Sequence, residues 1–249
     1  MKYTVESDIG RKRAINEDRA AFFERSDTLK MAVLADGMGG HNAGDIASEM
    51  AVTLMEAYFL EADESIFLQE QTLEEWLIQS VSKVNYEIYQ YSLTHEDCAG
   101  MGTTLIVAIL VNKQLMISHV GDSRVYTITD DKTTLITKDH PYVNMLIELG
   151  QISEEEALSH PKKNAILKAI GTEPKIVPDI YVELIKEPMY ILICSDGLSN
   201  KLSEGEIAAI LALSISLKEK GVKLIQLANE SGGEDNISFV LLNFDDSEV

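Results

Sequence analysis

The stretch VLADGMGG, residues 33–40, sets an apolar run directly against an Asp-Gly pair and then two more glycines. The run has the character of a buried strand, and it stops on the carboxylate of Asp36. Glycine beside a charged side chain leaves room for the backbone to approach a ligand closely. This junction therefore predicts a strand that delivers Asp36 to a ligand, with the glycines keeping space around it.

The same pattern recurs along the chain. MISHVGDS carries an apolar segment to Asp122, YILICSDG carries another to Asp196, and GGEDN places Asp235 just before the last predicted strand. Any one of these aspartates is explained by turn chemistry or by a helix cap. Four of them in one chain are harder to assign to turns alone. We expect the four side chains to converge.

Converging carboxylates need a counter-charge, since two of them ~4 Å apart repel by about 4 kcal/mol at an effective dielectric constant of 20. Oxygen ligands without histidine or cysteine favour Mg²⁺ or Mn²⁺ over zinc. Two such ions ~3.5–4 Å apart lower the pKa of bound water and neutralise phosphate oxygens. The aspartate pattern therefore predicts phosphoester hydrolysis.

The segment DIGRKRAINED, residues 8–18, adds three candidates to this site. Arg13 has the planar fork of donors that clamps a phosphate, and Glu17 and Asp18 could hold metal-bound waters. The alternative for Arg13 is a solvated surface base, and the sequence does not decide between the two.

Composition excludes several classes of protein. The chain has 249 residues, of which 45% are hydrophobic, so we expect one compact domain. No apolar stretch approaches the ~20 residues of a membrane span, and the N-terminus lacks the blocks of a secretory signal, which predicts a cytoplasmic protein. The net charge of −20 argues against nucleic acid and anionic membrane as partners. Cys98 and Cys194 are expected to be free thiols.

The N-terminal half predicts strands at 2–9, 19–24 and 30–35, followed by two helices. Asn42 is expected to cap the first helix, whose apolar face is predicted to carry Ile46, Met50, Leu54 and Ala57. Thr72 and Glu75 are expected to form a capping box for the second, which should run to about Leu93 with one face made by Leu77, Val81, Val84 and Ile88.

The C-terminal half begins with β-branched segments at 103–111, 114–120, 123–129 and 133–137, which predict an antiparallel meander. All five prolines fall between residues 141 and 188, and this region reads as an excursion from the core. A strand at 189–194, helices at 203–213 (with Ser203 and Glu206 as a capping box) and 214–229, and a strand at 236–244 follow. Residues 246–249 form an acidic tail.

Seven motifs resemble, in order and spacing, those of the bacterial metal-dependent Ser/Thr protein phosphatases of type 2C. They are DIGRKRAINED, ADGMGGHNAGDIAS, GMGTTL, HVGDSRVY, TKDH, CSDGLSN and GGEDNIS. The resemblance spans essentially the whole chain. It implies an α+β fold over residues 1–245, a four-layer α-β-β-α sandwich of two antiparallel sheets flanked by helices, with a flap at about 140–180.

The resemblance also implies roles for individual residues. It implies a centre of two Mn²⁺ or Mg²⁺ ions with attack on the phosphorus by a metal-bridging water. Arg13 would grip the phosphoryl group. The implied metal set is Asp36 bridging both ions, the Gly37 carbonyl, Asp196 and Asp235, with Glu17 and Asp18 acting through water and Asp122 joining Asp196 at a third ion.

One position departs from the family. Members of eukaryotic type carry a histidine directly after the Asp-Gly pair, proposed as the general acid, and this chain has Met38 there. His41 or a metal-bound water are the alternatives, because a donor near neutral pKa needs only hydrogen-bond reach. His119 lies within a predicted strand and is interpreted as a core residue. His140 and His160 are interpreted as flap structure.

Other phosphatase classes are excluded by spacing. Cysteine phosphatases need an arginine six positions after the cysteine, but Asn200 follows Cys194 and Thr104 follows Cys98. Aspartyl phosphotransferases need Asp-x-Asp, and no two aspartates have that spacing. A catalytically dead binding module would be expected to have lost a ligand such as Asp196. The sequence does not exclude the alternative that the chain is a phosphatase dedicated to one regulatory partner of the anti-sigma type.

We therefore expect a monomeric cytoplasmic phosphatase that removes phosphate from phosphoserine and phosphothreonine in proteins. It would oppose a cognate Ser/Thr kinase of the same cell, with phosphotyrosine as a minor substrate.

Overall fold

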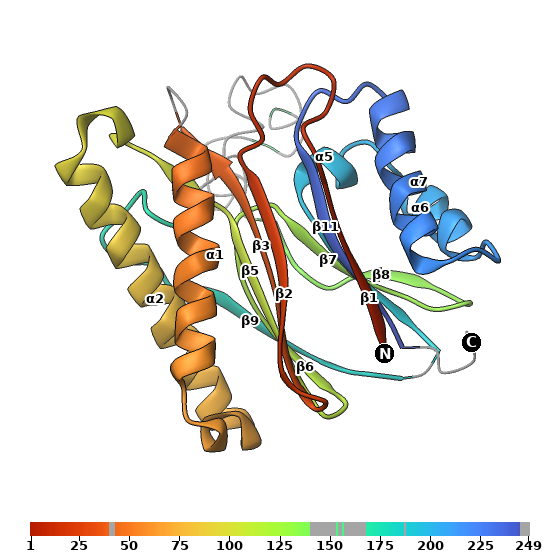
Figure 1. The fold of residues 1–249 in the computed structure, drawn as a ribbon, viewed down its shortest axis with the longest axis horizontal. Coiled ribbons are helices and arrows are strands. Elements are labelled where there is room, and N and C mark those ends of the chain that lie inside the picture. The colour runs from red at the N-terminus through yellow and green to blue at the C-terminus, as the bar shows by residue number, and fades with distance from the viewer. Residues whose placement is uncertain (40–42, 140–152, 154–155, 157–167, 187, 245–249) are drawn as a thin grey trace.

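Two antiparallel sheets face each other, and helices cover both outer faces (Figure 1). This is the arrangement in a computed structural model of the chain, which describes residues 1–39, 43–139, 153, 156, 168–186 and 188–244. The predicted α+β sandwich of four layers is confirmed, with α1 and α2 on one side and α6 and α7 on the other.

The strands of both sheets pair in antiparallel fashion throughout. The first sheet has the order β1 (Lys2–Asp8), β11 (Ile237–Asn243), β10 (Tyr190–Cys194), β7 (Arg124–Ile128) and β8 (Thr133–Leu135). The second has the order β2 (Asp18–Ser26), β3 (Leu29–Met38), β5 (Leu105–Val111), β6 (Gln114–Val120) and β9 (Asp179–Leu184), and β4 (Gly102–Thr103) pairs with β3.

The core consists of three apolar layers, and β3 shows why. Its side chains alternate between the faces of the sheet. Met31 and Val33 pack toward the layer under α1 and α2, whereas Ala32 and Leu34 belong to the layer between the sheets. The third layer lies between the first sheet and α5–α7. A strand buried on both faces has no polar side to show, which accounts for the uninterrupted apolar run before Asp36.

The first helix, α1 (Ala43–Glu61), buries a different face from the one predicted. Its fully buried apolar side chains are Ala47, Ala51, Met55 and Phe59, and the predicted stripe at Ile46, Met50, Leu54 and Ala57 is only partly buried. Small residues on the buried face let the helix lie close to β3. The prediction chose the larger apolar side chains at helical spacing, so most of its residues precede the buried ones by one position. Asn42, the expected cap, lies outside the described residues.

The second helix, α2 (Glu70–Thr94), follows a 3₁₀ helix, η1 (Glu64–Leu68), and precedes another, η2 (Glu96–Cys98). Its predicted apolar face is confirmed, since Leu77, Val81, Val84 and Ile88 are all buried. The predicted capping box is wrong. Thr72 lies within the first turn, and its hydroxyl donates to the carbonyls of Ile66 and Gln69 instead of capping the helix.

The predicted meander is also wrong, and the error matters for the site. Strands β6 and β7 are consecutive but lie in different sheets, because β6 pairs with β5 and β9 whereas β7 pairs with β10 and β8. The chain crosses between the sheets at Gly121, whose φ of +116° is open to glycine. The crossing brings Asp122 to the end of the sandwich where Asp36 lies.

The proline-bearing region returns to the core earlier than predicted. Residues 179–184 form β9, which pairs with β6 at the edge of the second sheet. Before it, Ile170 forms a bridge with Thr103, and the buried Asn85 amide donates to Glu173 O and accepts from Gly171 N. Most of the predicted flap, 140–152, 154–155 and 157–167, lies outside the described residues.

The last elements largely follow the sequence. The short helix α5 (Asp196–Ser199) was missed, α6 (Glu204–Leu211) begins with the predicted capping box of Ser203 and Glu206, and α7 (Leu217–Glu230) begins with a second box at Ser216 that was not predicted. Cys98 and Cys194 are free and buried. Within the described ranges, no helix combines the length and apolar character that a bilayer crossing requires. The acidic tail is not described.

The crossing at Gly121 gives a test of the fold. We predict that Gly121→Ala lowers the free energy of unfolding by about 1–3 kcal/mol, because an alanine would have to hold positive φ and its Cβ would lie 2.6 Å from Thr104 Cγ2. Gly205→Ala is the matched control. Its Cβ meets nothing within 4 Å, and alanine in a helix should stabilise by roughly 0.5–1 kcal/mol. Urea denaturation measures both, and equal effects would contradict the account.

Candidate functional site

Asp36 and Asp18 form the centre of the candidate site. They are direct cross-strand partners in the β2–β3 ladder, at the end of the sandwich where β3 leaves the sheet. Thr104 brackets Asp36, because its backbone N–H donates to Asp36 O at 2.8 Å and its hydroxyl accepts from Asp36 N at 3.0 Å. Asp18 is only 2% exposed. Two carboxylates are thus held side by side in a buried place.

The other three strand-end aspartates reach the same place from separate elements. Asp122 follows β6 across the sheet crossing, Asp196 opens α5 directly after β10, and Asp235 precedes β11. Burial, together with the negative charges of Asp18, Asp196, Asp122 and Asp235, raises the pKa of Asp36 well above its ordinary value. The charges of the four strand-end aspartates therefore act on one another, together with that of Asp18, which the sequence had also named as a candidate.

The mutual repulsion extends to the neighbours of Asp36. Burial is the largest cause in each case: it raises the pKa of Asp18 to about 7, that of Asp122 to about 7 and that of Asp196 to about 6. Negative charge adds to it, chiefly from Asp196 for Asp18 and Asp122 and from Asp235 for Asp196. Ionising the whole group at neutral pH is therefore unfavourable without added positive charge.

One oxygen of Asp18 is available to a further ligand. Its Oδ2 accepts from the Ser195 hydroxyl at 2.7 Å, whereas Oδ1 is buried without a hydrogen-bond partner among the described residues. A buried carboxylate oxygen left in this way is costly unless a cation or water meets it. Ser195 also accepts from Ser238 N, so the orientation of Asp18 is set by β10 and β11 together.

The glycines close to Asp36 allow Glu17 to enter the site. Gly37 N donates to Glu17 O at 3.1 Å, and an added Cβ on Gly37 would collide with the carbonyl of Gly44. A Cβ on Gly44 would collide with the carboxylate of Glu17. Burial raises the pKa of Glu17, opposed by the positive charge of Arg13. The glycine-rich turn thus makes room for a second acid and leaves the Gly37 carbonyl close to the aspartates.

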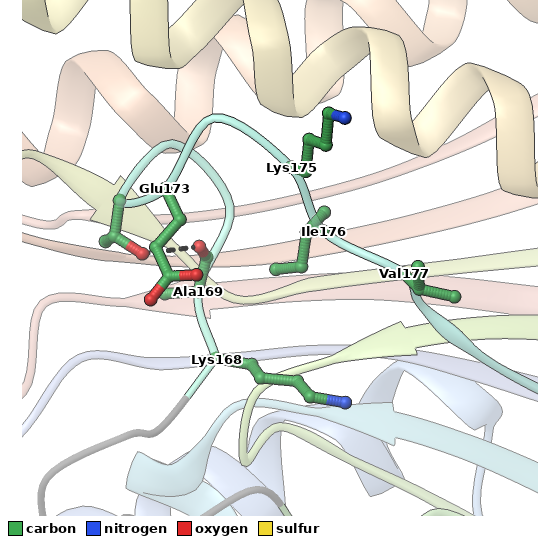
Figure 2. A pocket seen from close by; sticks show the side chains of 7 residues that line it. Lys168, Ala169, Glu173, Lys175, Ile176 and Val177 are labelled. Carbon is green, nitrogen blue, oxygen red and sulfur yellow. Dashed lines mark hydrogen bonds between the residues drawn. The ribbon is translucent and has the colours of Figure 1, made fainter.

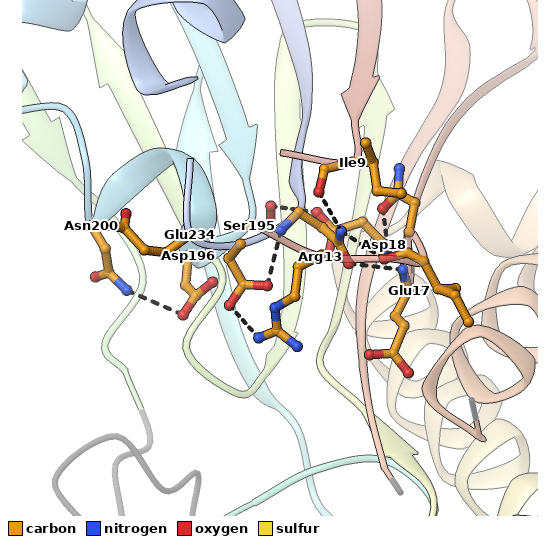
Figure 3. A network of polar contacts seen from close by, with 12 residues as sticks. Ile9, Arg13, Glu17, Asp18, Ser195, Asp196, Asn200 and Glu234 are labelled. Atoms are coloured by element: carbon orange, nitrogen blue, oxygen red, sulfur yellow. Dashed lines mark hydrogen bonds and ion pairs between the residues drawn. The ribbon is translucent and has the colours of Figure 1, made fainter. Parts of the chain in front are cut away.

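Arg13 lies in the loop between β1 and β2 and points toward the acids (Figure 3). Its NH2 group donates to Asp235 Oδ2 at 2.8 Å. Burial opposes its charge, but the ion pair with Asp235 and the charges of Glu17 and Asp36 raise its pKa overall. The side chain is 47% exposed, so it is reachable from outside. These contacts favour the phosphate-clamp interpretation over that of a solvated surface base.

Asn236 and Ser195 organise the site and were not singled out from the sequence. The Asn236 amide donates to the carbonyls of Ile9 and Ile15, and its Oδ1 accepts from Glu17 N at 2.8 Å. It therefore closes the loop that carries Arg13 and holds the start of β2. Both residues are neighbours of ligand candidates within the CSDG and GGEDN motifs, which was the only signal that the sequence offered.

A bidentate ion pair lies beside Asp122. Arg124 donates from Nε to Asp139 Oδ1 at 3.1 Å and from NH2 to Asp139 Oδ2 at 2.7 Å. Asp139 belongs to the TKDH motif, to which no role had been given. The pair acts on Asp122 in opposite senses, since Asp139 raises its pKa and Arg124 lowers it. Arg124 thus supplies part of the positive charge at this edge of the site.

The histidines contribute little that the structure describes. His119 is fully buried in β6, and its Nε2 lies 2.9 Å from the Ser123 carbonyl, so its interpretation as a core residue is confirmed. This contact links β6 to the segment in which the chain crosses between the sheets. His41, the alternative proton donor, lies outside the described residues, as do His140 and His160.

The donor set fits hard divalent cations that retain water. Among the described residues, no three His, Cys, Asp or Glu side chains form a ready-made cage for an ion. Mg²⁺ does not need one, because it usually keeps several waters and binds through one or two carboxylates. The oxygen ligands available for such an ion are the carboxylates with raised pKa values, the unpartnered Oδ1 of Asp18 and the carbonyl of Gly37, which directly follows Asp36.

A small hollow of about 280 Å³ lies on the segment that follows the undescribed part of the flap. It is lined by Lys168, Ala169, Thr172, Glu173, Lys175, Ile176 and Val177. The side chains of Lys168 and Lys175 point away from each other (Figure 2). None of the acids assigned to the candidate site lines it, so it is a feature separate from the carboxylate centre.

Comparison with known proteins agrees with this geometry. A family model described as Protein phosphatase 2C matches residues 10–237. The chain is 42% identical over 242 residues to a Ser/Thr phosphatase (stp) of Listeria innocua, covering 97% of this chain and 95% of the relative.

Two solved structures are also similar. That of the S. agalactiae Ser/Thr phosphatase superposes with a TM-score of 0.89 at 40% identity, covering 96% of this chain and 98% of the other. The catalytic domain of the Ser/Thr protein phosphatase PstP, solved in complex with two manganese ions, gives 0.79 at 32% identity with 97% of each chain covered. With the sandwich and the acidic centre, these matches establish that the chain belongs to the protein phosphatase 2C family of metal-dependent Ser/Thr phosphatases.

Proposed function

We propose that the acidic centre binds two divalent ions, Mn²⁺ or Mg²⁺, and that this chain uses them to remove phosphate from phosphoserine and phosphothreonine in proteins. The observation that carries the proposal is the group of half-buried aspartates around the buried Asp18, whose negative charges raise one another's pKa. Such a group is stabilised by added positive charge. The PstP structure, described with two manganese ions, supports the same number here.

The residues assigned to the ions follow from their positions. Asp36, whose pKa responds to the charges of all four other aspartates, is proposed to serve both ions together with the carbonyl of the next residue, Gly37. Asp196 and Asp235 complete the direct set. Glu17 and Asp18 are proposed to act through water. Asp122, whose pKa responds chiefly to burial and then to Asp196, is proposed to join Asp196 at a third ion.

The chemistry divides between the ions and the chain. When bound, divalent ions lower the pKa of water and neutralise phosphate oxygens. The chain itself orients the phosphoryl group. Arg13 has five N–H donors, and the recorded contact with Asp235 engages NH2, so further donors remain for phosphate oxygens. The water-accessible position of this guanidinium suits a phosphorylated side chain that enters from the surface.

The proton that the departing serine or threonine oxygen needs must come from another group. Met38 follows the Asp-Gly pair, and its thioether has no proton to give. We propose His41 as the donor, with a bound water as the alternative. We further propose that the chain works as a monomer in the cytoplasm and opposes a Ser/Thr kinase.

Replacing Asp196 tests the metal assignment. We predict that Asp196→Ala lowers phosphate release from a phosphothreonine peptide in Mn²⁺ by at least about a hundredfold, because charge stabilisation by bound metal contributes several kcal/mol and each 1.4 kcal/mol is tenfold. A chelator should abolish the activity of the unmodified chain. Asp130→Ala, which removes an exposed acid, is the matched control and should leave the rate unchanged. Turnover that survives both chelation and Asp196→Ala would reject the scheme.

The raised pKa values predict how the metal-free chain responds to pH. Acids whose folded pKa is raised to about 6 or 7 bind more protons in the folded than in the unfolded state above about pH 4. Their contribution to stability is present at low pH and is lost as pH rises through the folded pKa. In a chelator, we therefore expect the Tm to fall between pH 5 and 7.5, and Mn²⁺ to raise it more at pH 7.5.

Substitutions isolate this effect from the general acidity of the chain. Asp122→Asn removes one of the carboxyl groups whose pKa is raised, so the Tm of this variant should fall less steeply with pH. Asp131→Asn, at an exposed position, should not. Differential scanning calorimetry measures the Tm of the unmodified chain and of each variant at pH 5 and pH 7.5, with chelator and with Mn²⁺. A Tm of the metal-free chain that rises across this pH window would contradict the site.

Arg13 has its own test. Arg13→Lys keeps the charge but loses the planar fork, and we predict a rise in KM for the phosphopeptide on the order of tenfold. Arg13→Ala should raise it further. Lys223→Ala, which removes a charge of the same sign from the exposed side of α7, is the control. Steady-state kinetics at fixed ionic strength separates these cases, and an unchanged KM for Arg13→Ala would remove Arg13 from the site.

A further inference from the structure

The loop that carries Arg13 is attached to the segment that carries Asp235 at three successive residues. Arg11 N donates to Gly233 O at 2.8 Å, Lys12 Nζ lies 3.1 Å from Glu234 Oε1, and Arg13 NH2 lies 2.8 Å from Asp235 Oδ2. The backbones also approach closely, since a Cβ on Gly10 would lie 3.1 Å from Gly233 O. The tip of the loop thus rests directly on residues 233–235.

Glu234 extends this contact to a third segment. Its second oxygen, Oε2, forms an ion pair with Lys201. Lys201 lies two residues beyond the end of α5, the short helix that opens with Asp196. One carboxylate therefore joins the three segments that carry Arg13, Asp196 and Asp235.

The three attachments of the loop tip are not equivalent for catalysis. Arg13 must share its donors between Asp235 and the phosphoryl group when substrate binds. The attachment through Lys12 and Glu234 does not take part in that exchange and can hold the tip in place while it happens. Restraining a binding group in advance lowers the conformational entropy lost when the substrate binds.

We infer that Glu234 is a positioning residue that sets the affinity for the phosphoryl group by holding the Arg13 loop against α5. The inference rests on the proposed role of Arg13 as the phosphate clamp. It assigns to Glu234 no contact with substrate and no part in binding the ions. Its two lysine partners divide the work: Lys12 holds the loop, and Lys201 ties Glu234 to the segment of Asp196.

Glu234→Gln is the primary test, because it keeps the size of the side chain and removes its charge. We expect KM for a phosphothreonine peptide to rise about threefold to tenfold while kcat stays within about twofold. The Mn²⁺ dissociation constant, measured by calorimetry without substrate, should also stay within about twofold. A merely structural role would not separate KM from both of these quantities.

Glu230→Gln is the matched control. Glu230 is an acid four positions earlier, on α7, and it accepts from Gln226 at 2.8 Å. Among the described residues it forms no hydrogen bond or ion pair with the Arg13 loop. It should leave KM unchanged. Glu234→Asp serves as a second variant, since it retains the charge but is too short to keep both lysines in place, and we expect an intermediate KM. The Tm of each variant reports that the fold is retained.

A double-mutant cycle identifies the partner through which Glu234 acts. Lys12→Met should raise KM like Glu234→Gln, and the double variant should be no worse than the more affected single variant, because both remove the same contact. Lys201→Met is expected to have the smaller effect. Full additivity of Lys12→Met and Glu234→Gln would overturn the inference.

The outcomes separate this inference from the proposed function. If Arg13→Ala raises KM and Glu234→Gln does not differ from Glu230→Gln, the inference is wrong and the phosphate clamp stands. If Glu234→Gln weakens Mn²⁺ binding or lowers kcat as much as it raises KM, Glu234 acts on the metal centre and the inference is again wrong. If Arg13→Ala leaves KM unchanged, the clamp fails and the inference fails with it.

Discussion

Repulsion between buried carboxylates is the constraint on which the rest of this structure depends. Asp36 is surrounded by four other aspartates, and burial together with their charges shifts its pKa well upward. Such an arrangement lowers the stability of the isolated chain, so the fold must compensate elsewhere. Apolar layers on both sides of each sheet do so, because they remove large side chains from water along the whole length of the central strands. The free energy gained by burying these apolar layers offsets the repulsion between the carboxylates at one end of the sandwich.

The architecture concentrates the acids because several strands end at one edge. Antiparallel neighbours β2 and β3 bring Asp18 opposite Asp36, and the crossing between the sheets brings Asp122 from the second sheet toward the first. Neutral side chains then set the orientation of the acids. Ser195 holds Asp18, and Asn236 holds the start of β2 and both ends of the Arg13 loop. Hydroxyl and amide groups can do this without adding charge to a site that already has too much of one sign.

Positive charge is scarce in a chain of net charge −20, and its placement at the site is correspondingly informative. Arg13 meets Asp235, Arg124 meets Asp139 beside Asp122, and Lys12 and Lys201 meet Glu234. Each of these cations thus forms an ion pair with an acid in or next to the acidic group. Arg13 and Arg124 lower the pKa of Asp196, but burial still dominates. These cations therefore reduce the repulsion between the carboxylates. They do not remove it, and the remaining negative charge favours the divalent ions on which the proposed catalysis rests.

The sequence by itself predicted which acids would lie near one another, because apolar strands that stop on aspartates and glycines are a local pattern with a local physical cause. It also determined the two-sheet sandwich through its motifs, the buried face of α2 and the cap of α6. It did not determine the buried face of α1, which depends on how closely the helix approaches β3. Nor did it determine the pairing of β6 and β7, since short strands joined by a polar turn look alike whether they pair or change sheets. Only the tertiary structure decided the route by which Asp122 reaches Asp36, that Asn236 and Ser195 orient the acids, and that Glu234 connects three segments. Those contacts join residues that are tens to hundreds of positions apart, and no periodicity along the chain records them.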